Sequence, residues 1–224
     1  MRIKAIIIDL DGTITKFNLD YVAARRRALE ELEKRGLRTA EMTDQVNLYV
    51  ILNRLRDNLD PETYSKLRST FYGFFEEMEL KAAQGVTLLP GAVATLRKLR
   101  SQSLKLGIVT NNSRSGTELT LKRHHLETMF DAVVTRDDCE EMKPDSAPIK
   151  KILAELHASV DQAILVGDGA MDMMAAKAAG IRSVAVSTGP FPIERILKAE
   201  PDYLLGSIND LPSLIEQLEN PVES

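Results

Sequence analysis

Four carboxylates lie in two short motifs whose residue types could hold a divalent cation. Asp9 and Asp11 belong to the motif DLDGT, and Asp168 and Asp172 lie four residues apart in the motif GDGAMD. Carboxylates that are brought together repel one another, so they stay ionised only beside a cation or strong hydrogen-bond donors. Hard oxygen ligands of this kind suit Mg²⁺, which also binds water and phosphate oxygens. The alternative is that these acids are ordinary turn and helix-cap residues.

Two further motifs contain groups that could bind an anion. Thr110 and Asn111 follow the apolar run LKLGIV, and Lys143 precedes Pro144, whose ring fixes the local backbone. A lysine cation beside the four acids would offset their repulsion and hold a phosphate as a point charge. Taken singly, Thr110 and Asn111 are equally well interpreted as a helix cap or Asx turn, and Lys143 as a solvated surface group.

Alternating strands and helices are predicted to position these motifs. Residues 3–10 are β-branched and almost continuously apolar, which is typical of a strand buried on both faces of a parallel sheet. The fold class is therefore α/β, a Rossmann-like three-layer α/β/α domain with a parallel sheet, and its ligands bind at the carboxyl ends of the strands. Further strands are expected at 104–110, 132–135, 163–166, 183–186 and 203–205, with helices at about 91–100, 115–126, 147–157, 171–179 and 210–218.

The segment between the first two motifs has a different character. Helices are predicted over 21–35, over about 43–56 and from Pro61 onward, where Asp60 is the expected N-cap. No strand signal interrupts them, which indicates an inserted all-helical cap domain. We therefore expect a Rossmann-like core domain at residues 1–15 and 86–224 and a helical cap domain at 16–85.

Two groups of side chains in this insert have open interpretations. The run Arg25 to Arg27 could contact a phosphorylated ligand from the cap, but a solvated helix face near Glu30 and Glu31 is the preferred interpretation. The aromatic residues between Phe71 and Phe75 could line a pocket, but packing inside the cap is preferred.

Composition excludes several classes of protein. The 224 residues carry a formal net charge of −4, which argues against a binder of nucleic-acid backbones. Asp9 interrupts the first apolar run, and no run approaches the roughly 20 residues that span a bilayer. The single cysteine, Cys139, allows no intrachain disulfide and fits a reducing cytosol. We expect a cytoplasmic monomer or homodimer with no nucleic-acid or membrane partner.

Four motifs follow one another along the chain: DLDGT, Thr110-Asn111, Lys143-Pro144 and GDGAMD. In this order they resemble the motifs of the haloacid dehalogenase superfamily, in its phosphoglycolate phosphatase-like branch. The resemblance spans nearly the whole chain, and the helical insert is similar to the C1 cap of that family. It implies a phosphoric monoester hydrolase that depends on Mg²⁺. The implied substrate is a small phosphorylated metabolite such as phosphoglycolate or a sugar phosphate.

The resemblance also implies a role for each motif residue. Asp9 is expected to be the nucleophile that forms an aspartyl-phosphate, and Asp11 the general acid and then the base. Mg²⁺ is expected to be bound by the carboxylates of Asp9 and Asp168 and by the backbone carbonyl of Asp11. Asp172 is expected to support the metal through a water molecule. The transferring phosphoryl group is expected to be bound by Thr110, the Asn111 amide and Lys143.

Two other functions remain open at this point. A sugar phosphomutase of the same superfamily would return the phosphoryl group to a sugar instead of to water. A phospho-accepting signalling module that resembles a response-regulator receiver also needs acids, a threonine and a lysine around a metal. The helical insert and the late second acid pair fit the receiver poorly.

Overall fold

The computed structural model of the protein describes residues 2–220. In this part of the chain six strands form one sheet in the order β3-β2-β1-β4-β5-β6, with every neighbouring pair parallel. This is the strand order of a doubly wound sheet, and it confirms the predicted α/β class. The strands are β1 (Ala5–Ile8), β2 (Lys105–Val109), β3 (Ala132–Val134), β4 (Ala163–Gly167), β5 (Arg182–Val186) and β6 (Tyr203–Leu205).

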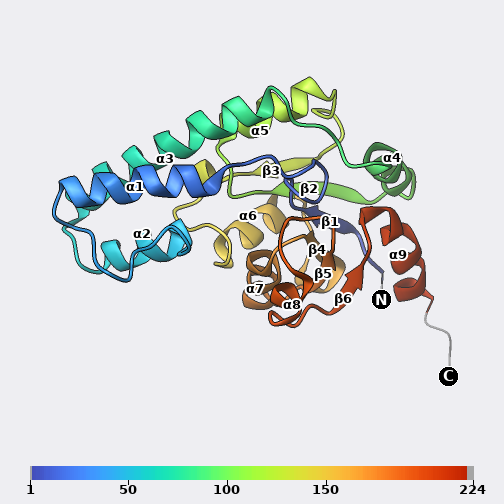
Figure 1. Ribbon diagram of the computed structural model, residues 1–224. Coiled ribbons are helices and arrows are strands. Elements are labelled where there is room, and N and C mark those ends of the chain that lie inside the picture. The colour runs from blue at the N-terminus through green and yellow to red at the C-terminus, as the bar shows by residue number, and fades with distance from the viewer. Residues whose placement is uncertain (1, 221–224) are drawn as a thin grey trace.

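Helices cover both faces of the sheet and make the three predicted layers (Figure 1). Along β1, Ile6 and Ile8 face one layer while Ala5 and Ile7 face the other, because successive side chains of a strand point to opposite faces. One layer contains α4 (Ala92–Ser101), α5 (Arg114–Arg123) and α9 (Leu211–Glu219), and the other contains α6 (Ala147–Glu155), α7 (Ala170–Ala179) and α8 (Ile193–Leu197).

Three helices between β1 and α4 extend to one side of the sheet, at the left of Figure 1. They are α1 (Tyr21–Lys34), α2 (Leu48–Arg56) and α3 (Pro61–Ala83). Their inward faces form an apolar cluster of their own, which includes Leu32, Ile51 and Phe71. The helical insert is thus present as expected, and we refer to α1, α2 and α3 as the cap. The division of the chain into domains at residues 16 and 85 stays a prediction.

The two chain segments that connect the cap to the sheet run side by side. Thr15 forms an antiparallel bridge with Leu88, and the backbone N–H of Lys16 donates to the Thr87 carbonyl at 2.8 Å. The backbone N–H of Leu89 in turn donates to the Ile14 carbonyl at 2.9 Å. Paired segments of this kind fix where the cap leaves and re-enters the sheet domain.

Two elements differ from the sequence expectations. The second cap helix was expected from about residue 43 but begins at Leu48, because the Asn47 side chain caps it by accepting from the Tyr49 N–H at 2.8 Å. The short helix α8 was not expected, since its five residues are too few for a helical period to be recognised in the sequence. The Asp60 cap of α3 is confirmed, with its carboxylate accepting from the Thr63 N–H at 3.0 Å.

Within residues 2–220, no helix has the length and apolar content that crossing a membrane requires.

Candidate active site

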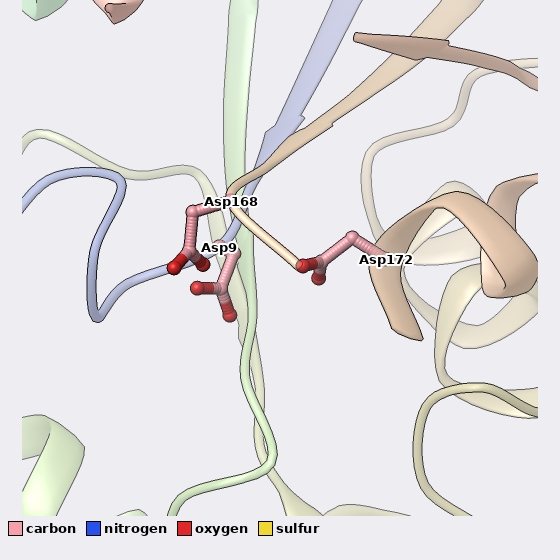
Figure 2. Close-up of side chains that lie close together, drawn as sticks. All are labelled: Asp9, Asp168 and Asp172. Carbon is pink, nitrogen blue, oxygen red and sulfur yellow. The ribbon is translucent and has the colours of Figure 1, made fainter. Parts of the chain in front are cut away.

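The polar motifs meet at the carboxyl edge of the sheet, where the strand order reverses. Ile8 of β1 pairs in register with Val166 of β4, so that Asp9 and Asp168 leave the sheet beside each other. Figure 2 shows their carboxylates close together, with Asp172 approaching from the start of α7. This edge between β1 and β4 is the switch point at which doubly wound folds bind ligands.

Three of the four predicted acids form one compact cluster. Asp9, Asp168 and Asp172 are all buried, and each offers an oxygen that lies within 4.8 Å of those of the other two. Asp11 lies outside this group, although it lines the same pocket. Its expected contribution to a metal through the backbone carbonyl stays a prediction.

Lys143 supplies the positive charge of the cluster. Its Nζ donates to Asp9 Oδ1 and to Asp172 Oδ1, both at 2.6 Å, and to the Val109 carbonyl at 2.9 Å. Burial disfavours the ammonium, but Asp172 and Asp9 together raise the pKa of Lys143 above its ordinary value. The interpretation of Lys143 as a solvated surface group is therefore wrong, because its side chain is only 4% exposed.

Lys143 donates hydrogen bonds to Asp9 and Asp172, whereas its charge acts on Asp168 without a hydrogen bond. Oδ2 of Asp168 is buried and accepts no hydrogen bond from residues 2–220. Burial, followed by repulsion from Asp9 and Asp172, raises the pKa of Asp168 to about 9. Burial also raises the pKa of Asp9 to about 7, in spite of Lys143. A buried oxygen without a donor, next to a second carboxylate, fits a bound divalent cation, for which Mg²⁺ is suited by its oxygen ligands.

Two glycines make room for this buried carboxylate oxygen of Asp168. A Cβ atom at Gly12 would lie 2.2 Å from Asp168 Oδ2, and one at Gly189 would lie 1.8 Å from the same atom. Gly12 also has a φ of +85°, which residues with side chains rarely adopt. The glycine of the motif DLDGT is thus required by both space and backbone conformation.

Asp11 is held by two side chains. Its Oδ1 accepts from the Thr15 hydroxyl at 2.8 Å, and its Oδ2 accepts from the Asn112 amide. The Tyr21 hydroxyl of α1 donates to the carbonyl oxygen of the same Asn112 side chain at 3.2 Å. Burial raises the pKa of Asp11, which favours its protonated form. The sequence analysis assigned Asn112 no functional role, and only the folded chain links it to Asp11.

Thr110 and Asn111 line the pocket at the end of β2, as expected. The Asn111 side chain binds the backbone of Lys143 twice, since Nδ2 donates to the Lys143 carbonyl at 2.9 Å and Oδ1 accepts from its N–H at 3.1 Å. The Thr110 hydroxyl accepts from the Asn112 N–H at 3.2 Å. These contacts join two of the four motifs, Thr110-Asn111 and Lys143-Pro144, into one unit.

The cluster lies at one side of a cavity of about 430 Å³ between the sheet and the cap. A cavity of this size is in the range that holds small molecules. The cap contributes Tyr72 and Phe75 to its lining, so these two rings are more than packing inside the cap. Arg25 also lines the cavity, together with Arg195 of α8, so Arg25 is not merely part of a solvated face.

A buried ion pair lies at the wall of the pocket, where Arg136 is part of the lining. Arg136 Nη1 donates to Glu79 of α3 and to the Asn111 carbonyl, while Nη2 donates to the Tyr72 carbonyl. Glu79 also accepts from the Ser113 N–H at 2.9 Å. Both partners of the ion pair are at most 3% exposed. Sequence analysis missed this pair, because its members lie 57 positions apart and carry no local signal.

The fold and the site together define an α/β protein with a helical cap over an acidic pocket at the switch point of a parallel sheet. Residues 6–186 match the family model of haloacid dehalogenase-like hydrolases, and the chain belongs to this family. The predicted family is therefore confirmed.

Several relatives resemble the chain over nearly its whole length. It is 30% identical over 218 residues to a protein named pyrophosphatase PpaX from Anoxybacillus flavithermus, covering 96% of this chain and 98% of the relative. A pyrophosphatase PpaX from Bacillus cereus is 27% identical over 220 residues, with 97% and 99% covered. The family and these relatives support a phosphatase enzyme.

Solved structures share the fold. A predicted phosphatase from Clostridium acetobutylicum superimposes with a TM-score of 0.70 at 21% identity, covering 97% of this chain and 100% of the other. A predicted phosphoglycolate phosphatase from Haemophilus somnus gives a TM-score of 0.64 at 22% identity, with 96% and 98% covered. At these identities the likeness concerns the fold.

Proposed function

We propose that this chain is a Mg²⁺-dependent phosphatase that hydrolyses a small phosphorylated metabolite through an aspartyl-phosphate on Asp9. The observation that carries the proposal is the convergence of Asp9, Asp168 and Lys143 in one pocket, where Asp168 retains a buried oxygen without a donor. Phosphoryl transfer depends on alignment and charge neutralisation, and this arrangement offers both.

Asp9 and Asp11 would divide the chemistry between them. In the first step an Asp9 oxygen bonds to phosphorus, the bond from phosphorus to the leaving oxygen breaks, and the Asp11 carboxyl group gives its proton to that oxygen. In the second step a water molecule loses a proton to Asp11 and bonds to phosphorus, and the bond to Asp9 breaks. Inorganic phosphate leaves, and both side chains return to their starting state. The raised pKa of Asp11 supports its part as an acid.

The remaining motif residues would hold the metal and the phosphoryl group. The Asp9 and Asp168 carboxylates and the Asp11 carbonyl would bind Mg²⁺, with Asp172 supporting it through water. Mg²⁺, when bound, supplies positive charge beside the phosphoryl oxygens. The phosphoryl group itself would be bound by Thr110, the Asn111 amide and Lys143.

The substrate is proposed to be small and phosphorylated. Phosphoglycolate and sugar phosphates are candidates from the family resemblance, and the relatives named pyrophosphatase add pyrophosphate. A cavity of about 430 Å³ can hold any of these beside the acidic cluster. The single cysteine supports a place in the cytoplasm, where thiols stay reduced. As to assembly, we propose a monomer or homodimer.

The proposal is tested by assaying the wild type and the variant Asp9→Asn on a panel of these phosphorylated compounds, with and without Mg²⁺. Asparagine has almost the same shape but is not a carboxylate nucleophile, so kcat should fall by at least about 1,000-fold with the fold intact. Asp57→Asn is the matched control, because the Asp57 side chain is 74% exposed and remote from the pocket lining. Wild-type turnover by Asp9→Asn would refute the proposal.

Product analysis in the same assay separates hydrolysis from the alternatives. A phosphatase releases one inorganic phosphate for each substrate consumed. An isomeric sugar phosphate without free phosphate would indicate a phosphomutase. A long-lived phosphorylated Asp9 without turnover would indicate a phospho-accepting module.

A further inference from the structure

Three arginines line the pocket. Arg136 is paired with Glu79, whereas Arg25 and Arg195 form no ion pair within residues 2–220. Arg25 comes from α1 of the cap, four residues after Tyr21, and Arg195 comes from α8 of the core. Residues four apart on a helix lie on the same face, which explains why Tyr21 and Arg25 both reach the cavity. The two cations therefore border the same space as Asp9 and Lys143.

In the part of the chain that the structure describes, neither Arg25 nor Arg195 forms an ion pair, in contrast to the sequence neighbours of Arg25. Arg26 pairs with Asp44 at 2.9 Å and Arg27 pairs with Glu77 at 2.8 Å. Within residues 2–220, no carboxylate lies at ion-pair distance from Arg25 or Arg195. Most donors of the two guanidinium groups are thus available to a ligand.

The contacts that the two arginines do make hold them toward the pocket. Arg25 Nη1 donates to the backbone carbonyl of Asp44 at 3.1 Å, and its guanidinium is half-buried. Arg195 lies over the ring of Phe191 at 5.3 Å, and Phe191 is itself part of the pocket lining. Burial, together with the nearby charge of Arg195, lowers the pKa of Arg25. Two like charges that face one cavity are stabilised by an anion between them.

We propose that Arg25 and Arg195 form a subsite for a second anionic group of the substrate. The substrate class is a phosphate ester or anhydride that carries a carboxylate or a further phosphate close to the transferred phosphoryl group. A guanidinium presents planar paired donors that match both kinds of anion. This inference rests on the proposed function and narrows its substrate class.

Arg25 and Arg195 belong to different parts of the molecule, so the subsite would also connect the cap to the core. Because Arg25 belongs to the cap and Arg195 to the core, an anion bound to both would connect the two parts across the pocket. A substrate with a neutral tail lacks this connection. The preference of the enzyme for a substrate with an anionic tail over one with a neutral tail therefore measures the contribution of the subsite.

The test compares phosphoglycolate and pyrophosphate with hydroxyethyl phosphate, which replaces the carboxylate by a neutral group. The readout is the ratio of kcat/KM for each anionic substrate to that for hydroxyethyl phosphate. In Arg25→Gln and in Arg195→Gln this ratio should fall about tenfold or more, as expected for the loss of a charge-assisted hydrogen bond. In Arg26→Gln the ratio should stay at its wild-type value, since that side chain is 65% exposed and paired with Asp44.

The two anionic substrates distinguish the kind of group that is bound. A larger loss with pyrophosphate assigns the subsite to a second phosphate, and a larger loss with phosphoglycolate assigns it to a carboxylate. A ratio that stays constant in both pocket variants, while the enzyme hydrolyses all three compounds, would overturn the inference.

A binding measurement separates this inference from the proposed function. Calorimetric titration of phosphoglycolate and of pyrophosphate into Asp9→Asn, and into the same variant with Arg25→Gln, requires no turnover. We expect the affinity for at least one of them to fall about tenfold or more in the double variant. Equal affinity would overturn the subsite. A tenfold loss in a protein whose wild type hydrolyses none of the compounds would support the subsite and refute the phosphatase.

Discussion

At the scale of single residues, the three carboxylates of the acidic cluster receive unequal numbers of hydrogen bonds. Lys143 binds Asp9 and Asp172 at 2.6 Å each, and the Gly169 N–H donates to the other oxygen of Asp172 at 3.1 Å. Asp168 has a buried oxygen that no donor reaches in residues 2–220. Three clustered acids with one lysine leave negative charge for a cation to neutralise, and Asp168 indicates where the cation belongs.

The variant Asp168→Asn tests this interpretation at a single residue. Mg²⁺ at about 100 times its Kd should stabilise the wild type by about 2.7 kcal/mol, which raises Tm by roughly 5–10 °C. Asp168→Asn should lose most of this shift, because it removes a charged ligand. Without Mg²⁺ it should be no less stable than the wild type, since burial already disfavours the ionised Asp168. Thermal melts with and without Mg²⁺ measure both effects, and an unchanged Mg²⁺ shift would refute the role of Asp168. Asp57→Asn should keep the full shift.

At the scale of elements, α3 ties the cap to the core. Its first half packs inside the cap through Leu67 and Phe71, whereas Glu79 near its end binds Arg136 of the core. Arg136 also holds the carbonyl of Asn111, a predicted phosphate-binding residue. The end of this helix therefore supports the loop that is expected to bind the phosphoryl group.

Glu79→Gln and Glu77→Gln compare a buried and an exposed ion pair on the same helix. Glu79→Gln removes the buried carboxylate partner of Arg136 and leaves only Asp137, which is 43% exposed and 4.0 Å away. The free energy of unfolding should therefore fall by about 3–5 kcal/mol. Glu77 pairs with Arg27 at the surface, where its side chain is 69% exposed, so Glu77→Gln should change stability by less than about 1 kcal/mol. Urea unfolding monitored by circular dichroism gives both values. Equal effects of the two variants would contradict the structural role of the Glu79–Arg136 pair.

The strands and the predicted site motifs could be predicted because their signals are local. The apolar run that ends at Asp9 marks β1, and GDGAMD marks the start of α7. Since the carboxyl ends of parallel strands share one edge, the meeting of Asp9 and Asp168 followed from the fold class alone. The cap was recognised because no strand signal interrupts its helical periods.

The side-chain contacts of the site could not be predicted, because they join distant parts of the chain. The amide of Asn112 reaches Asp11 across 101 positions, and Arg195 reaches the pocket only through α8, which the sequence did not indicate. The burial of Lys143 likewise depends on Asp9 and Asp172, neither of which is near it in sequence. Such pairs become visible only once the elements are packed.

At the scale of the whole molecule, cap and core both line the substrate pocket and contact each other beside it. The Tyr49 hydroxyl of α2 donates to Glu141 at 3.1 Å, and Arg68 of α3 donates to the Glu140 carbonyl at 2.8 Å. Both core residues precede Lys143, so the cap contacts the loop that carries the lysine of the site. A cap that lines the pocket from one side restricts the access of water, which would matter if Asp9 is phosphorylated during the reaction.

Phosphorylation of Asp9 can be observed in a single-turnover experiment with the variant Asp11→Asn. With Mg²⁺ and p-nitrophenyl phosphate, whose leaving group needs no acid, the first step should proceed while the second stalls for lack of a base. We predict a burst of about one nitrophenolate per protein, and peptide mass mapping after rapid quenching should place one phosphoryl group on Asp9. The absence of a burst, or a burst that leaves Asp9 unmodified, would show that Asp9 is not the nucleophile.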